Sequence, residues 1–207
     1  SDTVLIGFSS LEAVSSEITN PFSKNRHGIT LGEAAAFFVV SKSPLDETGI
    51  ELLGYGESCD AYHLTSPDPS GDGAFQAMTE ALNRAGLKPE TIDYINLHGT
   101  GTKLNDSMEA KAVAKIFGEN KVLASTTKPM TGHTLGAAGA LEAAICYKAI
   151  VSKDGKIPLQ VWDGVQDEEL PAMNFASNKS EIKEIRVCMS NSYAFGGSNA
   201  SLILGVK

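Results

Sequence analysis

The chain has 207 residues, enough for one sizeable domain. Its apolar fraction of 42% and charged fraction of 20% are typical of an ordinary globular protein. A net charge of −8 without a basic stripe argues against nucleic-acid binding. The 3 cysteines are widely spaced, which predicts a reduced, cytoplasmic protein without a disulfide framework. The longest apolar run, residues 34–40, is too short to span a bilayer, so no membrane span is expected.

The first part of the chain carries apolar runs that predict strands. Residues 4–6 are expected to end a buried strand, and 8–14 could form a short helix. Residues 34–41 are rich in Ala, Phe and Val, which predicts a strand buried on both faces. Residues 51–58 are predicted as its continuation.

The rest of the chain alternates between helical and extended patterns. Phe75, Met78 and Leu82 recur at helical spacing, and Asn105 or Asp106 can cap the next helix. The patterns predict helices over 74–85, 105–117 and 134–151, and strands over 93–97, 121–125, 186–191 and 201–204. Such alternation implies an α/β fold: a mostly parallel sheet with helices on its faces, closed by an antiparallel hairpin.

His98 directly follows the predicted strand 93–97 and opens a run of small residues that includes Thr100 and Thr102. A lone histidine after a strand is more often structural. Here the intervening glycines let the backbone approach a ligand closely, at the strand ends where α/β sheets bind ligands. The two threonines offer hydroxyls to the same space.

His133 opens the predicted helix 134–151. A helix N-terminus lowers the pKa of an imidazole and keeps it neutral, so that it can donate a hydrogen bond. Two neutral histidines can converge on one developing negative charge. His98 and His133 therefore predict an enolate or oxyanion site.

Lys128 and Glu109 are the next candidates, although each alone is more often a surface residue. Together they could form an ion pair that positions the histidines. The Gly-rich turn at 190–199 could be a mobile loop whose Phe195 lines or gates an apolar channel.

The remaining histidines and the three cysteines give weaker indications of a functional role. His27 and His63 are interpreted as structural or surface residues, and Cys146 and Cys188 as inert core thiols. Cys59 has no adjacent base in the sequence. No ligand-spaced group of side chains predicts a metal site.

Taken jointly, five ordered segments resemble the β-ketoacyl-[acyl carrier protein] synthases, the ketosynthases of fatty-acid and polyketide synthesis. The segments are 25–28 with 32–33, 60–63, 98–109, 128–139 and 191–199. They extend over nearly the whole chain. The nearest resemblance is to elongating type II synthases, including relatives that build polyenes.

The resemblance implies a thiolase-like fold of two similar halves, each with a five-stranded sheet and helices. Residues 1–207 correspond to the C-terminal half. The nucleophilic cysteine belongs to the N-terminal half, so the fragment alone is expected to be inactive. The implied partners are that half, acyl carrier protein, and a second subunit in a homodimer or a ketosynthase heterodimer. No cofactor is implied, because the substrates are carried on the phosphopantetheine of acyl carrier protein.

The resemblance also implies an acyltransferase activity. Malonyl-acyl carrier protein would condense, with loss of carbon dioxide, with an enzyme-bound acyl thioester. His98 and His133 would hold the thioester oxygen of the malonyl group, and Lys128 and Glu109 would organise these histidines. Thr100, Thr102 and Phe195 complete the implied site: the threonines would bind the phosphopantetheine arm and Phe195 would gate the acyl pocket.

The chain departs from the family pattern at several positions. Lys103 stands where proline is common, and Ala34 and Ala194 stand where glycine is common. A Cβ at position 194 could restrict the loop before Phe195 and so alter chain-length selection. We expect Ala194→Gly to change the distribution of product lengths; an unchanged distribution would contradict this hypothesis.

Three other interpretations stay open on the sequence. A non-catalytic partner subunit of the chain-length-factor kind would lack the nucleophile, but both histidines and Lys128 are retained here. A thiolase acting on coenzyme A thioesters usually has a cysteine near the last glycine loop, and 191–199 has none. A stand-alone carrier-binding module would expose a large apolar face. The acyl chain length and the pathway stay open as well.

Overall fold

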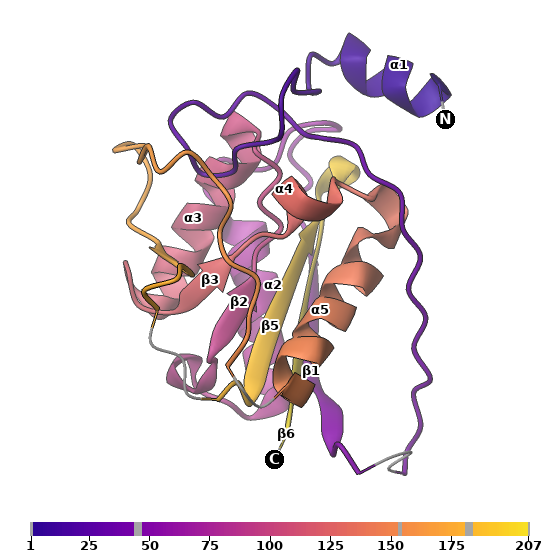
Figure 1. The fold of residues 1–207 in the computed structure, drawn as a ribbon, viewed down its shortest axis with the longest axis vertical. Coiled ribbons are helices and arrows are strands. Elements are labelled where there is room, and N and C mark those ends of the chain that lie inside the picture. The colour runs from indigo at the N-terminus through magenta and orange to yellow at the C-terminus, as the bar shows by residue number, and fades with distance from the viewer. Residues whose placement is uncertain (1, 44–46, 153–154, 181–183, 207) are drawn as a thin grey trace.

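The computed structural model describes residues 2–43, 47–152, 155–180 and 184–206 (Figure 1). Its centre is a 6-stranded sheet in the order β1-β6-β5-β2-β3-β4. The strands are β1 (Ile50–Cys59), β2 (Tyr94–Asn96), β3 (Leu123–Ser125), β4 (Asn174–Phe175), β5 (Val187–Tyr193) and β6 (Ser198–Val206). Strands β5, β2, β3 and β4 are parallel, whereas β6 is antiparallel to both β5 and β1.

This topology confirms the predicted α/β fold with a mostly parallel sheet and a C-terminal antiparallel hairpin. The sheet has one more strand than the five expected, because the short edge strand β4 adds to β3. The turn between β5 and β6 contains Gly196 and Gly197 at φ of 83° and 82°. These left-handed conformations explain the need for glycine there.

Helices cover both faces of the sheet (Figure 1). Helices α2 (Asp72–Ala85) and α3 (Lys103–Phe117) pack on one face, and α5 (Ala138–Ser152) packs on the other. Alternating side chains of each strand enter the two cores: Ile95 faces α2 and α3, while Tyr94 faces α5. The other helical segments are α1 (Asp2–Ser10), α4 (Lys128–Thr131) and the 3₁₀ turns η1 (Pro89–Thr91), η2 (Leu135–Ala137) and η3 (Phe195–Gly197).

One helical stretch, Leu135–Ser152, is long and apolar enough to cross a membrane by length and composition alone. Within it, Ala143, Cys146, Ala149 and Ile150 are buried in the core of the molecule. Glu142 of the same helix is also buried and pairs with Lys128. These contacts identify α5 as a core helix of this fold.

Two strand predictions were wrong. Residues 4–6 lie in helix α1, which buries none of its residues. Residues 34–41 form no strand within the described part of the chain, and Phe37 is 94% exposed. Both runs have the composition of buried strands, but neither meets a neighbouring strand among the described residues. By contrast, the predicted strand 51–58 is confirmed as β1.

The helix predictions over 74–85, 105–117 and 134–151 were confirmed with shifted boundaries, whereas the short helix predicted over 8–14 was wrong, since α1 ends at Ser10. Helix α3 begins at Lys103 rather than at Asn105 or Asp106. Asp106 does not cap the helix, because its carboxylate accepts hydrogen bonds from Phe22 and Gly101 instead. The predicted helix 134–151 begins with the 3₁₀ turn η2 and becomes α-helical only in α5.

Candidate active site

The loop after β2 places His98 at the carboxyl end of the parallel strands. Gly99 and Gly101 adopt φ of +39° and +80°, which turn the chain back sharply. A Cβ at Gly101 would lie 2.0 Å from the Thr19 hydroxyl oxygen. The loop therefore packs against Thr19. Glycine is required at position 101 both by this close contact and by its left-handed backbone conformation.

Two buried carboxylates of α3 hold this loop through hydrogen bonds to its backbone. Glu109 accepts the backbone N–H groups of His98 and Gly99, each at 2.8 Å. Asp106 lies one turn earlier on the same face of α3 and accepts the N–H of Gly101 at 3.2 Å. The first turns of α3 thus hold the backbone of the loop and determine where the His98 ring projects.

His133 is fixed by a close backbone contact with the segment at Leu31. Its N–H donates to the carbonyl of Thr30 at 2.6 Å, and its own carbonyl accepts the N–H of Gly32 at 3.1 Å. A Cβ at Gly32 would lie 2.1 Å from the carbonyl oxygen of Thr131. The absence of a side chain at Gly32 therefore allows the contact that positions His133.

The two imidazoles meet edge to face. Their ring centroids are 5.2 Å apart and their planes are inclined by 85°. Nδ1 of His98 lies 3.4 Å from Nζ of Lys128, and Nδ1 of His133 accepts the N–H of Leu135 at 3.2 Å. Because each Nδ1 faces a donor, the hydrogen on each ring is assigned to Nε2. Both histidines are then available as Nε2–H donors.

Both histidines are neutral at physiological pH. Burial lowers the pKa of His98 well below its usual value, and the neighbouring Lys128 and His133 lower it further. Burial and Lys128 lower the pKa of His133 to about 3. The predicted neutrality is confirmed in direction. Burial is the largest cause for both histidines, ahead of any effect of the helix N-terminus that follows His133.

The predicted ion pair between Lys128 and Glu109 was wrong. Lys128 is 1% exposed and pairs with Glu142, which is 2% exposed. Glu109 faces the backbone amides of the loop instead, and burial raises its pKa to about 7. Glu142 was missed by sequence reasoning, although it is the single charged side chain within an apolar helical run from Leu135 to Tyr147.

The predicted substrate-binding residues lie at the periphery of this centre. The hydroxyl oxygens of Thr100 and Thr102 are 2.9 Å apart. Phe195 is 51% exposed and stacks on Phe8 with ring centroids 5.9 Å apart. Among the described residues, the aromatic ring of the final hairpin in contact with His98 is that of Tyr193. The roles of the threonines and Phe195 stay predictions.

Several of the singled-out sequence segments come together here. Asp60 accepts a hydrogen bond from the Asn199 side chain at 2.6 Å, and its N–H donates to the Gly197 carbonyl at 2.8 Å. The segment 60–63 thus fastens the base of the loop at 195–199. Arg26 is buried and forms an ion pair with Asp167, and its Nε lies 3.9 Å from Oδ2 of Asp106. Because Asp106 holds the His98 loop, the segment 25–28 supports that loop indirectly.

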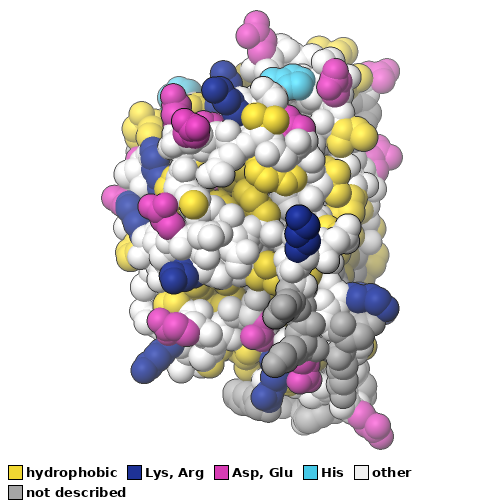
Figure 2. All heavy atoms as spheres, turned by 60° about the vertical axis from the view of Figure 1, so that its left-hand side comes forward, with side chains coloured by type: hydrophobic (Ala, Val, Ile, Leu, Met, Phe, Trp, Pro, Cys, Tyr) yellow, Lys and Arg dark blue, Asp and Glu magenta, His cyan; other side chains and the backbone are white. Residues whose placement is uncertain are grey.

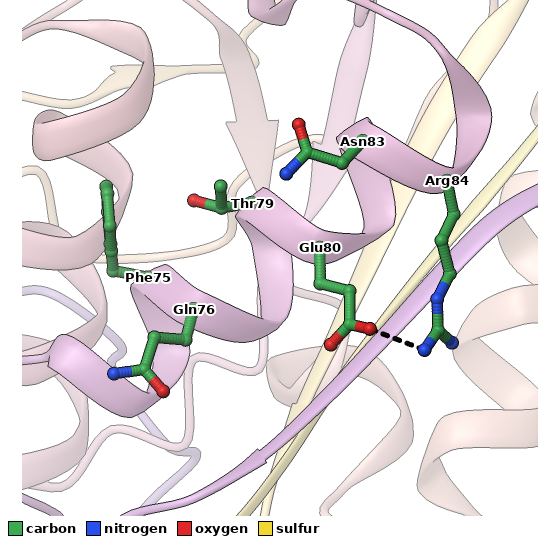
Figure 3. A pocket seen from close by; sticks show the side chains of 6 residues that line it. All are labelled: Phe75, Gln76, Thr79, Glu80, Asn83 and Arg84. Atoms are coloured by element: carbon green, nitrogen blue, oxygen red, sulfur yellow. Dashed lines mark ion pairs between the residues drawn. The ribbon is translucent and has the colours of Figure 1, made fainter.

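The surface hollow on α2, the search for metal ligands and the two remaining histidines offer no better candidate site than the histidine pair. A hollow on the outer face of α2 is lined by residues of that helix alone (Figure 3): Phe75, Gln76, Thr79, Glu80, Asn83 and Arg84. Glu80 and Arg84 form an ion pair within it. Across the described ranges, no three His, Cys, Asp or Glu side chains are grouped as metal ligands would be. His27 and His63 lie on the surface.

The fold and this histidine pair define an α/β protein of the thiolase-like class. Residues 50–161 match the model of the β-ketoacyl synthase C-terminal domain. The chain belongs to the β-ketoacyl synthase family.

Similar proteins support that membership. The 3-oxoacyl-[acyl-carrier-protein] synthase 2 of Coxiella burnetii is 41% identical over 96% of the chain and 50% of the relative. The synthase 2 of Staphylococcus aureus is 37% identical over 96% of the chain and 52% of its own length. The chain therefore spans about half the length of these relatives.

Solved structures agree with the fold. A chain in the complex of a ketosynthase with its chain length factor from Xenorhabdus doucetiae superposes with a TM-score of 0.85 at 43% identity. That match covers 100% of this chain and 51% of the other. A β-ketoacyl synthase from Burkholderia phymatum superposes with a TM-score of 0.82 at 28% identity, over 100% of this chain and 52% of the other.

Proposed function

We propose that this chain is the enolate-stabilising half of a condensing enzyme. The whole protein would join malonyl-acyl carrier protein to an enzyme-bound acyl thioester and elongate a fatty-acid or polyketide chain. The observation that carries the proposal is the pair of neutral imidazoles, His98 and His133, each with Nε2–H free to donate.

The chemistry follows from this geometry. The two Nε2–H groups would donate to the thioester oxygen of the malonyl group. When the bond to the carboxylate breaks and carbon dioxide leaves, the electron pair enters the enolate, whose oxygen is already held by two donors. The enolate carbon then attacks the acyl thioester carbonyl, and the thiolate of the nucleophilic cysteine leaves. We expect that cysteine outside this chain.

Lys128 has a separate task in this scheme. Its ammonium group faces Nδ1 of His98 and is neutralised by Glu142. A donor at Nδ1 fixes the tautomer that carries hydrogen on Nε2. Burial, and to a lesser degree the Lys128 charge, keeps both imidazoles unprotonated, so that they act as neutral hydrogen-bond donors.

We assign four further features to the whole protein. Thr100 and Thr102 would contact the phosphopantetheine arm, and Phe195 would gate the acyl pocket. Acyl carrier protein would deliver both substrates, with no separate cofactor, in the cytoplasm. A second subunit would complete a dimer. On the face seen in Figure 2, basic and acidic side chains are interspersed.

The partner-subunit alternative is not favoured. The relatives that match at 37–41% identity are synthases by name. A chain-length-factor role would not require two neutral imidazoles with matched donors. The two possibilities differ in a measurable way, because a partner subunit would not lose activity through its own histidines.

The test uses the full-length protein with acyl- and malonyl-acyl carrier protein. His98→Ala and His133→Ala should abolish condensation but keep self-acylation, since neither histidine is needed to form the acyl-enzyme in this scheme. Lys88→Ala, on the exposed surface before β2, is the control and should behave as wild type. Condensation at the wild-type rate in both site variants would refute the proposal.

A further inference from the structure

Tyr193 is the residue of the final hairpin that contacts the candidate site. It ends β5, and the loop that carries Phe195 begins one residue later. Its ring lies edge-on to His98, with centroids 5.7 Å apart and planes inclined by 70°. His98 is therefore flanked by His133 and by Tyr193, while Lys128 faces its Nδ1.

These contacts restrict the orientation of the His98 ring. The scheme above needs Nδ1 to stay against Lys128, because a flipped ring would point Nε2 away from the substrate. The contact between Lys128 and Nδ1 is 3.4 Å, which is too long to hold the ring alone. An edge contact between two aromatic rings adds a geometric preference that opposes rotation.

The ring of Tyr193, rather than its hydroxyl, accounts for these contacts. Tyr193 is 6% exposed, and its hydroxyl oxygen makes no hydrogen bond of ordinary geometry among the described residues, although the Asn191 side chain lies close enough to lower the pKa of Tyr193. Burial outweighs this effect and raises that pKa well above its usual value, so the phenol stays protonated. Phenylalanine would fill the same space and keep the same ring contact.

We propose that Tyr193 is a positioning residue of this site. Its ring, in edge contact with the His98 imidazole, holds that imidazole against Lys128. Tyr193 acts through these groups and does not touch the substrate. The inference rests on the proposed function for its activity readouts, whereas the orientation of His98 can be measured without it.

The experiment compares Tyr193→Phe and Tyr193→Leu with Tyr55→Phe, which changes an exposed tyrosine of β1, in the full-length protein. Tyr193→Phe keeps the ring, so it should keep the wild-type kcat and a single His98 tautomer, with an equal or higher melting temperature. Tyr193→Leu should lower kcat by about tenfold or more. In ¹⁵N-histidine spectra of Tyr193→Leu, the His98 ring should populate both tautomers. Tyr55→Phe should match wild type throughout.

Either of two results would overturn the inference: a single wild-type tautomer of His98 in Tyr193→Leu, or a loss of turnover in Tyr193→Phe as large as in Tyr193→Leu. If the wild-type protein forms no condensation product, the proposed function fails. The tautomer measurement then still decides whether Tyr193 positions His98.

Discussion

At the scale of single residues, the protonation state of Glu109 determines how well the backbone of the His98 loop is held. Each oxygen of its carboxylate accepts one backbone N–H of that loop, which favours the ionised form. Burial nevertheless raises its pKa to about 7. Glu109 therefore titrates near neutral pH, and we expect the His98 loop to be best organised above about pH 7, where Glu109 is ionised.

We expect Glu109 to make the protein less stable as pH rises from 4.5 to about 7. Its folded pKa lies above the ordinary value of 4.5, so the native state keeps a proton that the unfolded state releases. The free energy of unfolding should fall across this window by on the order of 3 kcal/mol. Urea titrations of wild type and Glu109→Gln at pH 5 and pH 8 measure the effect.

The comparison with Glu109→Gln isolates this group. His98 and His133 have lowered pKa values, so their contribution has the opposite sign: stability rises with pH as it approaches 6.5. Both histidines are present in both proteins, and their contributions largely cancel in the difference. An identical pH slope in the two proteins would mean that Glu109 titrates normally.

The Lys128–Glu142 pair allows stability and chemistry to be separated. Lys128→Met should destabilise the protein by about 3–5 kcal/mol, because it leaves a buried carboxylate without its partner. Adding Glu142→Leu should recover most of that loss by removing the stranded charge. Condensation should stay absent in the double variant, since Nδ1 of His98 still lacks its donor. Urea unfolding and the condensation assay give the two readouts. A double variant with wild-type turnover would show that Lys128 is only structural.

At the scale of elements, the site depends on two backbone segments that touch. Gly32 and Gly132 lie against each other where the segment at 29–32 passes the end of α4. A Cβ at Gly32 would sit 2.1 Å from the Thr131 carbonyl, a backbone atom that can give way only if the segments separate. We expect Gly32→Ala to lower the melting temperature by several degrees and to reduce condensation, because His133 moves with its backbone partner.

Gly136→Ala is the matched control for this prediction. Gly136 has open space around its ideal Cβ and lies in η2, only three residues beyond His133. Alanine there should leave stability and turnover within experimental error of wild type. Equal losses of stability and turnover in the two variants would mean that the whole region is sensitive to substitution. They would contradict the prediction that the backbone contact at Gly32 is what positions His133.

The elements that sequence reasoning predicted are those whose partners lie within the chain. Strands at 93–97 and 186–191 were recognised because they pack under α2, α3 and α5. The two principal histidines and Lys128 were found from local motifs. Glu142 and Tyr193 were not, because their role depends on what faces them across the fold. Pairing of Lys128 with Glu142 rather than Glu109 is likewise a three-dimensional fact that spacing alone does not contain.

At the scale of the whole molecule, the run at 34–41 has no partner in the described fold. Phe37, Val39 and Val40 are 94%, 82% and 79% exposed, and the chain runs there as an extended segment on the side of α5 (Figure 1). Exposure of such a contiguous apolar run is unfavourable, and an unpaired extended segment is a template for strand addition. The relatives are about twice as long as this chain.

We therefore expect 34–41 to be covered in the whole protein by residues outside this chain. Hydrogen exchange on the full-length protein should show strong protection of amides 35–41, as expected for a buried segment. The exposed loop at 61–64, which lies in no helix or strand, is the internal control and should exchange quickly. Rapid exchange in both segments would contradict the expectation. Protection of 34–41 would also bear on the proposed site, because this run follows Gly32 closely in the chain and Gly32 makes the backbone contact that holds His133.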